Sequence, residues 1–232
     1  MKPTQEINDA IIPTESKPSN IKSLYKKWGH LLLFLYLPIH MVLFLQLESA
    51  ITTDYWVVYS PLDNLIPFVE AFIIPYVLWY PYMLGLGVYL AIQDVPIFKR
   101  YMWFIIIGFV SSMLFCLIIP NGQDLRPTAF ASENVFTDIV KSLYAADTNT
   151  NVFPSMHVIG AMAVTYTVFK CPKLNNIYIK ISSIVLTALI CASTVFLKQH
   201  SILDIFGGLI ASQLIFMLVF RKPKKKRATL SS

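Results

Sequence analysis

The sequence predicts an all-α, polytopic membrane protein, a bundle of six transmembrane helices with both termini in the cytoplasm. Hydrophobic residues make up 56% of the 232 residues and charged residues only 14%, and the mean hydropathy is +0.59. This balance excludes an ordinary soluble domain. The apolar residues also fall into six separate runs, most of them long enough to cross a bilayer as a helix.

The six runs divide the chain into a membrane domain over residues 29–220 and two tails. Residues 1–28 are expected to form a polar cytoplasmic tail, and residues 221–232 a basic one. The first run lacks a small-residue cleavage site, so we expect a retained span rather than a signal peptide. The predicted spans are 29–47, about 65–92, 101–119, 154–169, 178–197 and 204–220.

The distribution of basic residues orients the bundle. If both termini are cytoplasmic, sixteen of the nineteen Lys and Arg residues lie on that side, as the positive-inside rule requires. The exceptions are Arg126 and Lys141, in the extracytoplasmic loop 120–153, and Lys198. A basic residue on the disfavoured side needs another explanation, and binding an anion provides one. The net charge of +6 is then a topology signal, and no nucleic-acid partner is expected.

Candidate functional residues gather at the extracytoplasmic ends of the last four spans. His200 and Asp204 are four residues apart, so a helix that begins near His200 would place both side chains on one face. In the alternative interpretation, His200 lies at the membrane interface and Asp204 occupies a first helical turn, which favours negative charge. The other candidates at these ends are Arg126, Ser155, His157 and Lys198.

These residue types suit phosphoryl transfer. A phosphate ester needs cations and hydrogen-bond donors around its oxygens, which Arg126, Lys198, the Ser155 hydroxyl and helix N–H groups can supply. One histidine can attack phosphorus while the other protonates the leaving alkoxide. A carboxylate that holds the attacking imidazole fixes its tautomer and stabilises its positive charge.

The same residues resemble the signature of the type 2 phosphatidic acid phosphatase superfamily. That signature is Lys-x6-Arg-Pro, then Pro-Ser-Gly-His, then Ser-Arg-x5-His-x3-Asp. The order and the six-span layout match over roughly residues 30 to 220. The pieces in this sequence are Arg126-Pro127, Pro154-Ser155-Met156-His157, and Ser193-Thr194 followed by His200 and Asp204.

The resemblance implies a role for each residue. His200 would be the nucleophile that forms a phosphohistidine, Asp204 would orient it, and His157 would be the general acid. Arg126 and Ser155 would hold the phosphate, without a metal or cofactor.

Two family cations are missing in this chain. Ile119 and Thr194 stand where the family has lysine and arginine, and Lys198 or Lys141 would have to compensate. The Ser-Thr form resembles the branch that contains inositol phosphorylceramide synthases and sphingomyelin synthases, together with many bacterial phosphatase-type relatives.

The sequence therefore predicts that residues 29–220 form a lipid-phosphate phosphatase of the cell membrane, with its active site on the extracytoplasmic side. It would hydrolyse a lipid phosphomonoester or pyrophosphate through a phosphohistidine. One alternative is a phospholipid head-group phosphotransferase that uses the same residues, and another is a non-catalytic lipid-binding or transport relative. The particular lipid and the oligomeric state do not follow from the sequence.

Overall fold

The computed structural model describes residues 25–51 and 53–221, which are mostly helical. Five helical segments are long and apolar enough to cross a membrane, and their outward sides carry many exposed large hydrophobic residues. The prediction that the chain is a helical, multi-pass membrane protein is confirmed. The α-helices are α2 (Tyr36–Ala50), α3 (Ile73–Gln93), α4 (Val95–Ile118), α5 (Val135–Ala146), α6 (Met156–Lys170), α7 (Ile177–Phe196) and α8 (Ile202–Val219).

Short elements join the helices. A 3-10 helix, η1 (Gly29–Leu35), leads directly into α2, and the others precede α3 or α7. They are η2 (Pro61–Asn64), η3 (Glu70–Phe72) and η4 (Pro172–Leu174), with the two-residue strands β1 (Trp56–Val57) and β2 (Asn121–Gly122).

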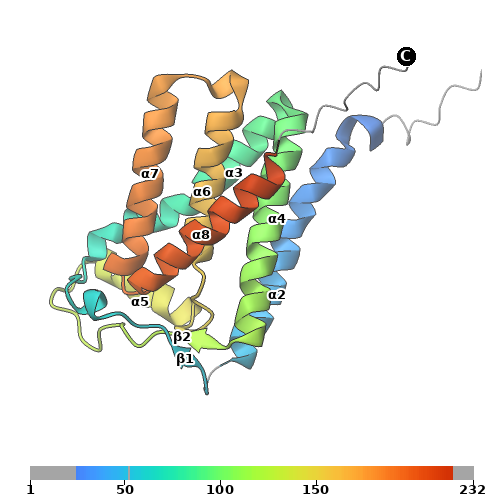
Figure 1. Cartoon of the computed structure of the whole chain (residues 1–232). Helices are drawn as coiled ribbons and strands as arrows, with labels where there is room; N and C mark the ends of the chain where they lie inside the picture. The colour runs from blue at the N-terminus through green and yellow to red at the C-terminus, as the bar shows by residue number, and fades with distance from the viewer. Residues whose placement is uncertain (1–24, 52, 222–232) are drawn as a thin grey trace, which may run out of the picture.

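Helix α6 forms the centre of the bundle and contacts α3, α4, α7 and α8 (Figure 1). Small residues permit this packing: a side chain at Gly160 would collide with Trp79 and Met83 of α3. On α8, a Cβ at Gly208 would meet the Val158 side chain at 2.8 Å. The α6 helix has only 15 residues, fewer than any of the five candidate spans, and is enclosed by its neighbours.

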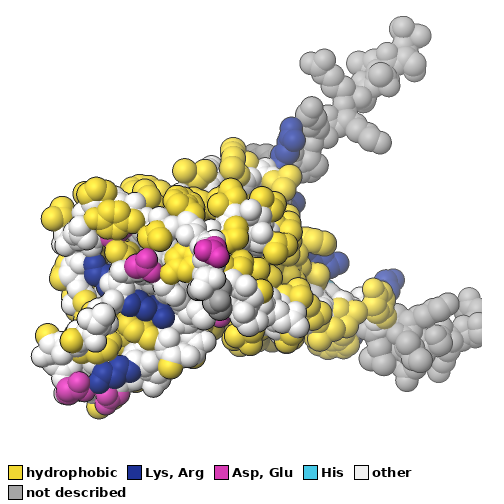
Figure 2. All heavy atoms as spheres, turned by 90° about the horizontal axis from the view of Figure 1, so that it is seen from below, with side chains coloured by type: hydrophobic (Ala, Val, Ile, Leu, Met, Phe, Trp, Pro, Cys, Tyr) yellow, Lys and Arg dark blue, Asp and Glu magenta, His cyan; other side chains and the backbone are white. Residues whose placement is uncertain are grey.

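The loops at one end of the bundle, which we call the loop end, contain β1, β2 and α5 (Figure 1). The strands are parallel, with Trp56 opposite Asn121. Figure 2 views the molecule from this end, where charged side chains appear on the face and hydrophobic ones around it. The described chain begins and ends at the opposite end of the bundle (Figure 1).

Two predicted span starts differ from the observed helices. Helix α4 begins at Val95 rather than Tyr101, since the Asp94 side chain accepts from Ile97 N at 3.1 Å and caps it. Residues 65–69 precede η3 and are not helical. The remaining predicted spans differ from the observed helices by only a few residues.

The 120–153 loop contains a helix that was not predicted. The Asn134 side chain accepts from Thr137 N at 3.0 Å and starts α5. The helix is amphipathic: Thr137 and Val140 are buried against the bundle, while Val135 is exposed. The predicted cytoplasmic tails, 1–28 and 221–232, lie almost entirely outside the described residues.

Candidate active site

His200 and Asp204 form a buried pair at the start of α8. The His200 Nδ1 atom lies 3.0 Å from Asp204 Oδ2, and their exposures are 8% and 0%. The helix begins at Ile202, two residues after His200. The two side chains meet because His200 lies in the preceding turn, where its backbone N–H donates to Thr194 O at 3.0 Å.

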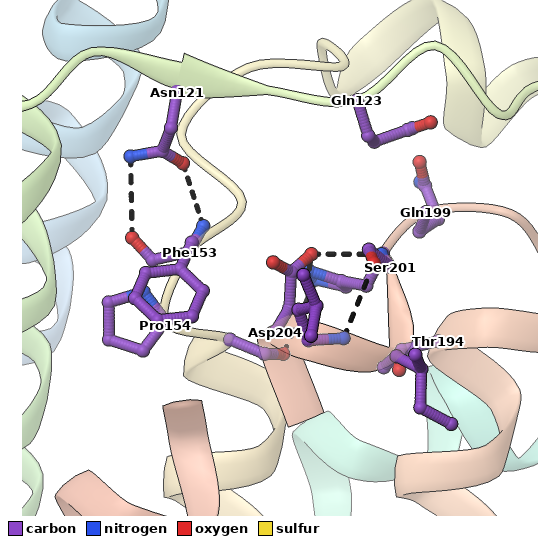
Figure 3. A network of polar contacts seen from close by, with 12 residues as sticks. Asn121, Gln123, Phe153, Pro154, Thr194, Gln199, Ser201 and Asp204 are labelled. Atoms are coloured by element: carbon purple, nitrogen blue, oxygen red, sulfur yellow. Dashed lines mark hydrogen bonds and ion pairs between the residues drawn. The ribbon is translucent and has the colours of Figure 1, made fainter. Parts of the chain in front are cut away.

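The same carboxylate also caps the helix. Asp204 Oδ2 accepts from Ser201 N at 3.0 Å, and Ser201 with Asp204 forms a capping box. Figure 3 shows this contact beside Thr194 and Gln199. The two interpretations of Asp204, a first-turn acid and an orienting carboxylate, are therefore both realised by one side chain.

The carboxylate defines the tautomer of His200. A buried carboxylate accepts hydrogen bonds, so Nδ1 carries the proton and Nε2 keeps a free lone pair. The Nε2 atom lies 3.4 Å from Ser155 Oγ. This arrangement is that of a nucleophile or base with its orienting partner.

Asp63 is a positioning residue that the sequence analysis did not identify. Its Oδ2 accepts from Ser201 Oγ at 2.6 Å and its Oδ1 from Ile202 N at 2.8 Å, so it holds the turn that carries His200. The signal was the Ser60-Pro-x-Asp63 sequence, which forms a capping box around η2.

His157 faces His200 from the first turn of α6. Its ring packs against Tyr76 and Trp79, with centroids 4.3 Å apart in each case, and lies 6.1 Å from the His200 ring. The Nε2 atom is buried and has no hydrogen-bond partner among the described residues. This unpartnered nitrogen makes His157 a candidate for contact with a ligand.

Ser155 precedes α6 and is fully buried, but its side chain does not cap the helix. Hydrogen bonds hold the backbone segment before Ser155. Ser112 Oγ donates to Pro154 O at 2.7 Å, and the Asn121 side chain forms hydrogen bonds with the backbone of Phe153 (Figure 3). The first-turn N–H groups of a helix have no intrahelical partners. A helix N-terminus of this kind can hold an anion, and the Ser155 hydroxyl lies beside it.

Arg126 lies behind the site rather than in it. Its guanidinium donates to Tyr144 O and Thr148 O, at 3.2 and 2.6 Å, and to the side chain of Gln199. Burial lowers its pKa, and the nearby Asp147 carboxylate acts in the opposite direction. Gln199 precedes His200, so Arg126 reaches the histidines only through this side chain.

The structure does not bring Lys198 or Lys141 to the histidines. The Lys198 ammonium donates to Asp63 O and Ile66 O, at 2.7 and 2.6 Å, and desolvation lowers its pKa. Lys141 is exposed and pairs with Glu133 at 2.6 Å. Neither lysine supplies a cation in place of the two missing from the signature.

A cavity of about 660 Å³ opens beside the two histidines. It extends between α2, α3 and α4, where its walls are apolar, and its polar end is formed by the loop end. None of the lining residues is Lys or Arg. Its ionisable lining residues other than tyrosines are His40, Glu48, Asp147, His157 and His200.

Metal binding was not expected from the sequence. In residues 25–51 and 53–221, no group of three or more His, Cys, Asp or Glu residues is arranged to hold a metal ion. The metal-independent chemistry remains a prediction.

The chain belongs to the PAP2 superfamily, because the family model matches residues 101–228, or 128 of the 232 residues. The matched region includes Arg126, Ser155, His157, His200 and Asp204. Searches of curated proteins and of solved structures find no significant match. Membership indicates a phosphatase or phosphotransferase type of function in a membrane protein. The assignment to a branch of the superfamily remains a prediction.

Proposed function

We propose that this protein is an integral membrane lipid-phosphate phosphatase, which hydrolyses a phosphomonoester or pyrophosphate of a lipid through a phosphohistidine on His200. The observation that carries the proposal is the buried His200–Asp204 pair, whose free Nε2 faces Ser155. His157 lies across from it with an unpartnered nitrogen.

In the first step, His200 Nε2 attacks phosphorus and the bond from phosphorus to the lipid oxygen breaks. His157 donates its proton to the departing oxygen, so the lipid alcohol leaves neutral. The imidazole gains positive charge as the new bond forms, and the Asp204 carboxylate stabilises it through Nδ1–H.

In the second step, a water molecule attacks the phosphohistidine. His157, now neutral, accepts a proton from the water, the phosphorus–nitrogen bond breaks, and phosphate leaves. His200 recovers its lone pair and His157 its proton, so the cycle consumes only the lipid phosphate and one water molecule.

The phosphate oxygens are held by the start of α6. Backbone N–H groups and the Ser155 hydroxyl donate to these oxygens, and a helix N-terminus favours the negative charge that develops on them. Arg126 acts indirectly, because it holds the Gln199 side chain and the 144–148 backbone by hydrogen bonds.

The lipid chain occupies the apolar part of the cavity, which extends between α2, α3 and α4. We further propose that α6 is the sixth membrane crossing, that both termini are cytoplasmic, and that the site opens toward the extracytoplasmic leaflet of the cell membrane. The concentration of basic residues at the opposite end supports this orientation.

The test is phosphate release by purified protein in EDTA, across a panel of lipid phosphates and pyrophosphates. His200→Ala and His157→Ala are expected to abolish release while the protein stays folded in detergent. His30→Ala is the matched control, since His30 bonds Ala91 O away from the cavity. Full activity in His200→Ala contradicts the proposal.

A head-group phosphotransferase is the second candidate. His200 is only 8% exposed, and the cavity beside it is largely apolar. A lipid alcohol can therefore reach the phosphohistidine and compete with water for it. Product analysis with and without added diacylglycerol or ceramide distinguishes transfer from hydrolysis. Phospholipid binding without any turnover is the outcome expected of a non-catalytic relative.

A further inference from the structure

Asp147 places a carboxylate beside both histidines. Its Oδ2 accepts from Tyr76 OH at 3.5 Å and from Gln199 Nε2 at 3.4 Å. Tyr76 packs on the ring of His157, and Gln199 directly precedes His200. The carboxylate is therefore one side chain away from each histidine, and it lines the same cavity.

Glu48 brings a second carboxylate to this place from the end of α2. Its Oε1 accepts from the backbone N–H and the hydroxyl of Thr148, at 3.2 and 2.7 Å. Thr148 follows Asp147, so the two acids are fixed next to each other although they are 99 residues apart in sequence. Glu48 is only 4% exposed and lines the cavity.

No ion pair in the described structure includes either acid of this pair, although the Arg126 guanidinium lies near Asp147. Within the described ranges, no Lys or Arg lines the cavity. The Arg126 guanidinium is already bonded to two carbonyls and Gln199. Buried carboxylates are rare unless paired, because desolvation of an unpaired charge is costly.

A third acceptor points to the same kind of ligand. Asn151 lines the cavity and is 4% exposed, and its Oδ1 atom is buried with no hydrogen-bond partner in the described structure. An amide oxygen and two carboxylates are acceptors only, when the carboxylates are ionised. The ligand group that satisfies all three is a cationic donor, such as an ammonium with three N–H bonds.

We propose that the cavity selects a lipid phosphate that carries a cationic amine close to its phosphate, and that Glu48 and Asp147 receive the amine while His200 faces the phosphorus. This inference rests on the proposed function for the placement of the phosphate. It assigns to Glu48 and Asp147 a specificity role that is separate from the chemistry at the histidines.

The probes are sphinganine 1-phosphate and its N-acetyl derivative, which differ in the charge of the nitrogen. Binding is measured in detergent with His200→Ala protein, so that neither ligand is consumed, and phosphate release is measured with the wild-type protein. The free amine is expected to bind at least about tenfold more tightly, as one charged hydrogen bond requires.

Glu48→Gln keeps an oxygen for Thr148 and removes only the charge, and Asp147→Asn does the same at the second acid. Each change is expected to reduce the amine preference by about tenfold or more. Glu133→Gln is the matched control, because Glu133 is exposed and pairs with Lys141 outside the cavity.

Equal binding of the two probes overturns the inference, as does a preference that survives both substitutions. Amine-selective binding that depends on Glu48 and Asp147, without phosphate release by the wild type, supports the inference and refutes the proposed phosphatase activity. Phosphate release without amine selectivity supports the proposed phosphatase activity and refutes the inference about the amine.

Discussion

Asp204→Asn tests whether the negative charge of the carboxylate supports the reaction at His200. Asp204 accepts two hydrogen bonds of 3.0 Å, from His200 Nδ1 and from Ser201 N. Both bonds end on Oδ2, so an asparagine that places its oxygen there keeps both bonds and puts its NH₂ group at the Oδ1 position, which has no partner among the described residues. The substitution then removes the negative charge that stabilises the imidazole as it gains positive charge, while Nδ1–H still has its acceptor.

The expected loss follows from that change. A hydrogen bond to a charged group contributes about 1.5–3 kcal/mol, so a decrease of about 10- to 100-fold in phosphate release is expected. Stability should fall by only about 1–2 kcal/mol, because the helix cap is kept.

The assay measures phosphate release and thermal unfolding on the same preparations. Asp63→Asn is the comparison, since it loosens the same turn through Ser201 and Ile202 without touching the imidazole. It should affect unfolding at least as much as Asp204→Asn but activity much less. Wild-type activity in Asp204→Asn would refute the argument that the carboxylate charge stabilises the imidazole during the reaction.

Three further predictions concern the surroundings of the histidines. Ser155→Ala should lower kcat about 10- to 100-fold through loss of a hydrogen-bond donor to the phosphate. The melting temperature should change little, because the Ser155 side chain does not cap the helix. An unchanged kcat would show that the hydroxyl does not bind the phosphate. Lys198→Met should destabilise the protein by about 1–3 kcal/mol through loss of its bonds to two carbonyls. In the folded fraction, kcat/KM is expected to stay within about threefold of the wild-type value, because Lys198 does not bind the phosphate. A large rise in KM would show that Lys198 does bind it. Gly208→Val should reduce the yield of folded protein, since its Cβ meets Val158 and the Ser155 backbone and overpacking costs about 1–3 kcal/mol; wild-type yield and melting temperature would show that α6 and α8 are less closely packed than described.

The sequence predicted the parts of the site that depend on local spacing. His200 and Asp204 meet because they are four residues apart across a helix start, and that geometry survives a shift of the start to Ile202. His157 and Ser155 follow from their position at the beginning of an apolar run. The helical, membrane-spanning class follows from composition alone.

Other features could not be predicted because they depend on side-chain direction or on distant contacts. Lys198 lies two residues before His200 and Arg126 lies in the loop before α6, yet each side chain turns to backbone carbonyls. Glu48 and Asp147 meet only after α2 and the 120–153 loop have packed together. Helix α5 begins at a capping Asn134 within a polar stretch that hydropathy describes as loop.

The central claim is a covalent phosphohistidine on His200, and trapping it is the most direct test. Protein mixed with a lipid substrate labelled in its phosphate is quenched with alkali, in which a phosphorus–nitrogen bond survives, and the label is located by peptide mapping. The account predicts a label on His200 that is labile in acid and absent from His200→Ala. Turnover with no trapped label on His200, or with the label on another residue, would contradict it.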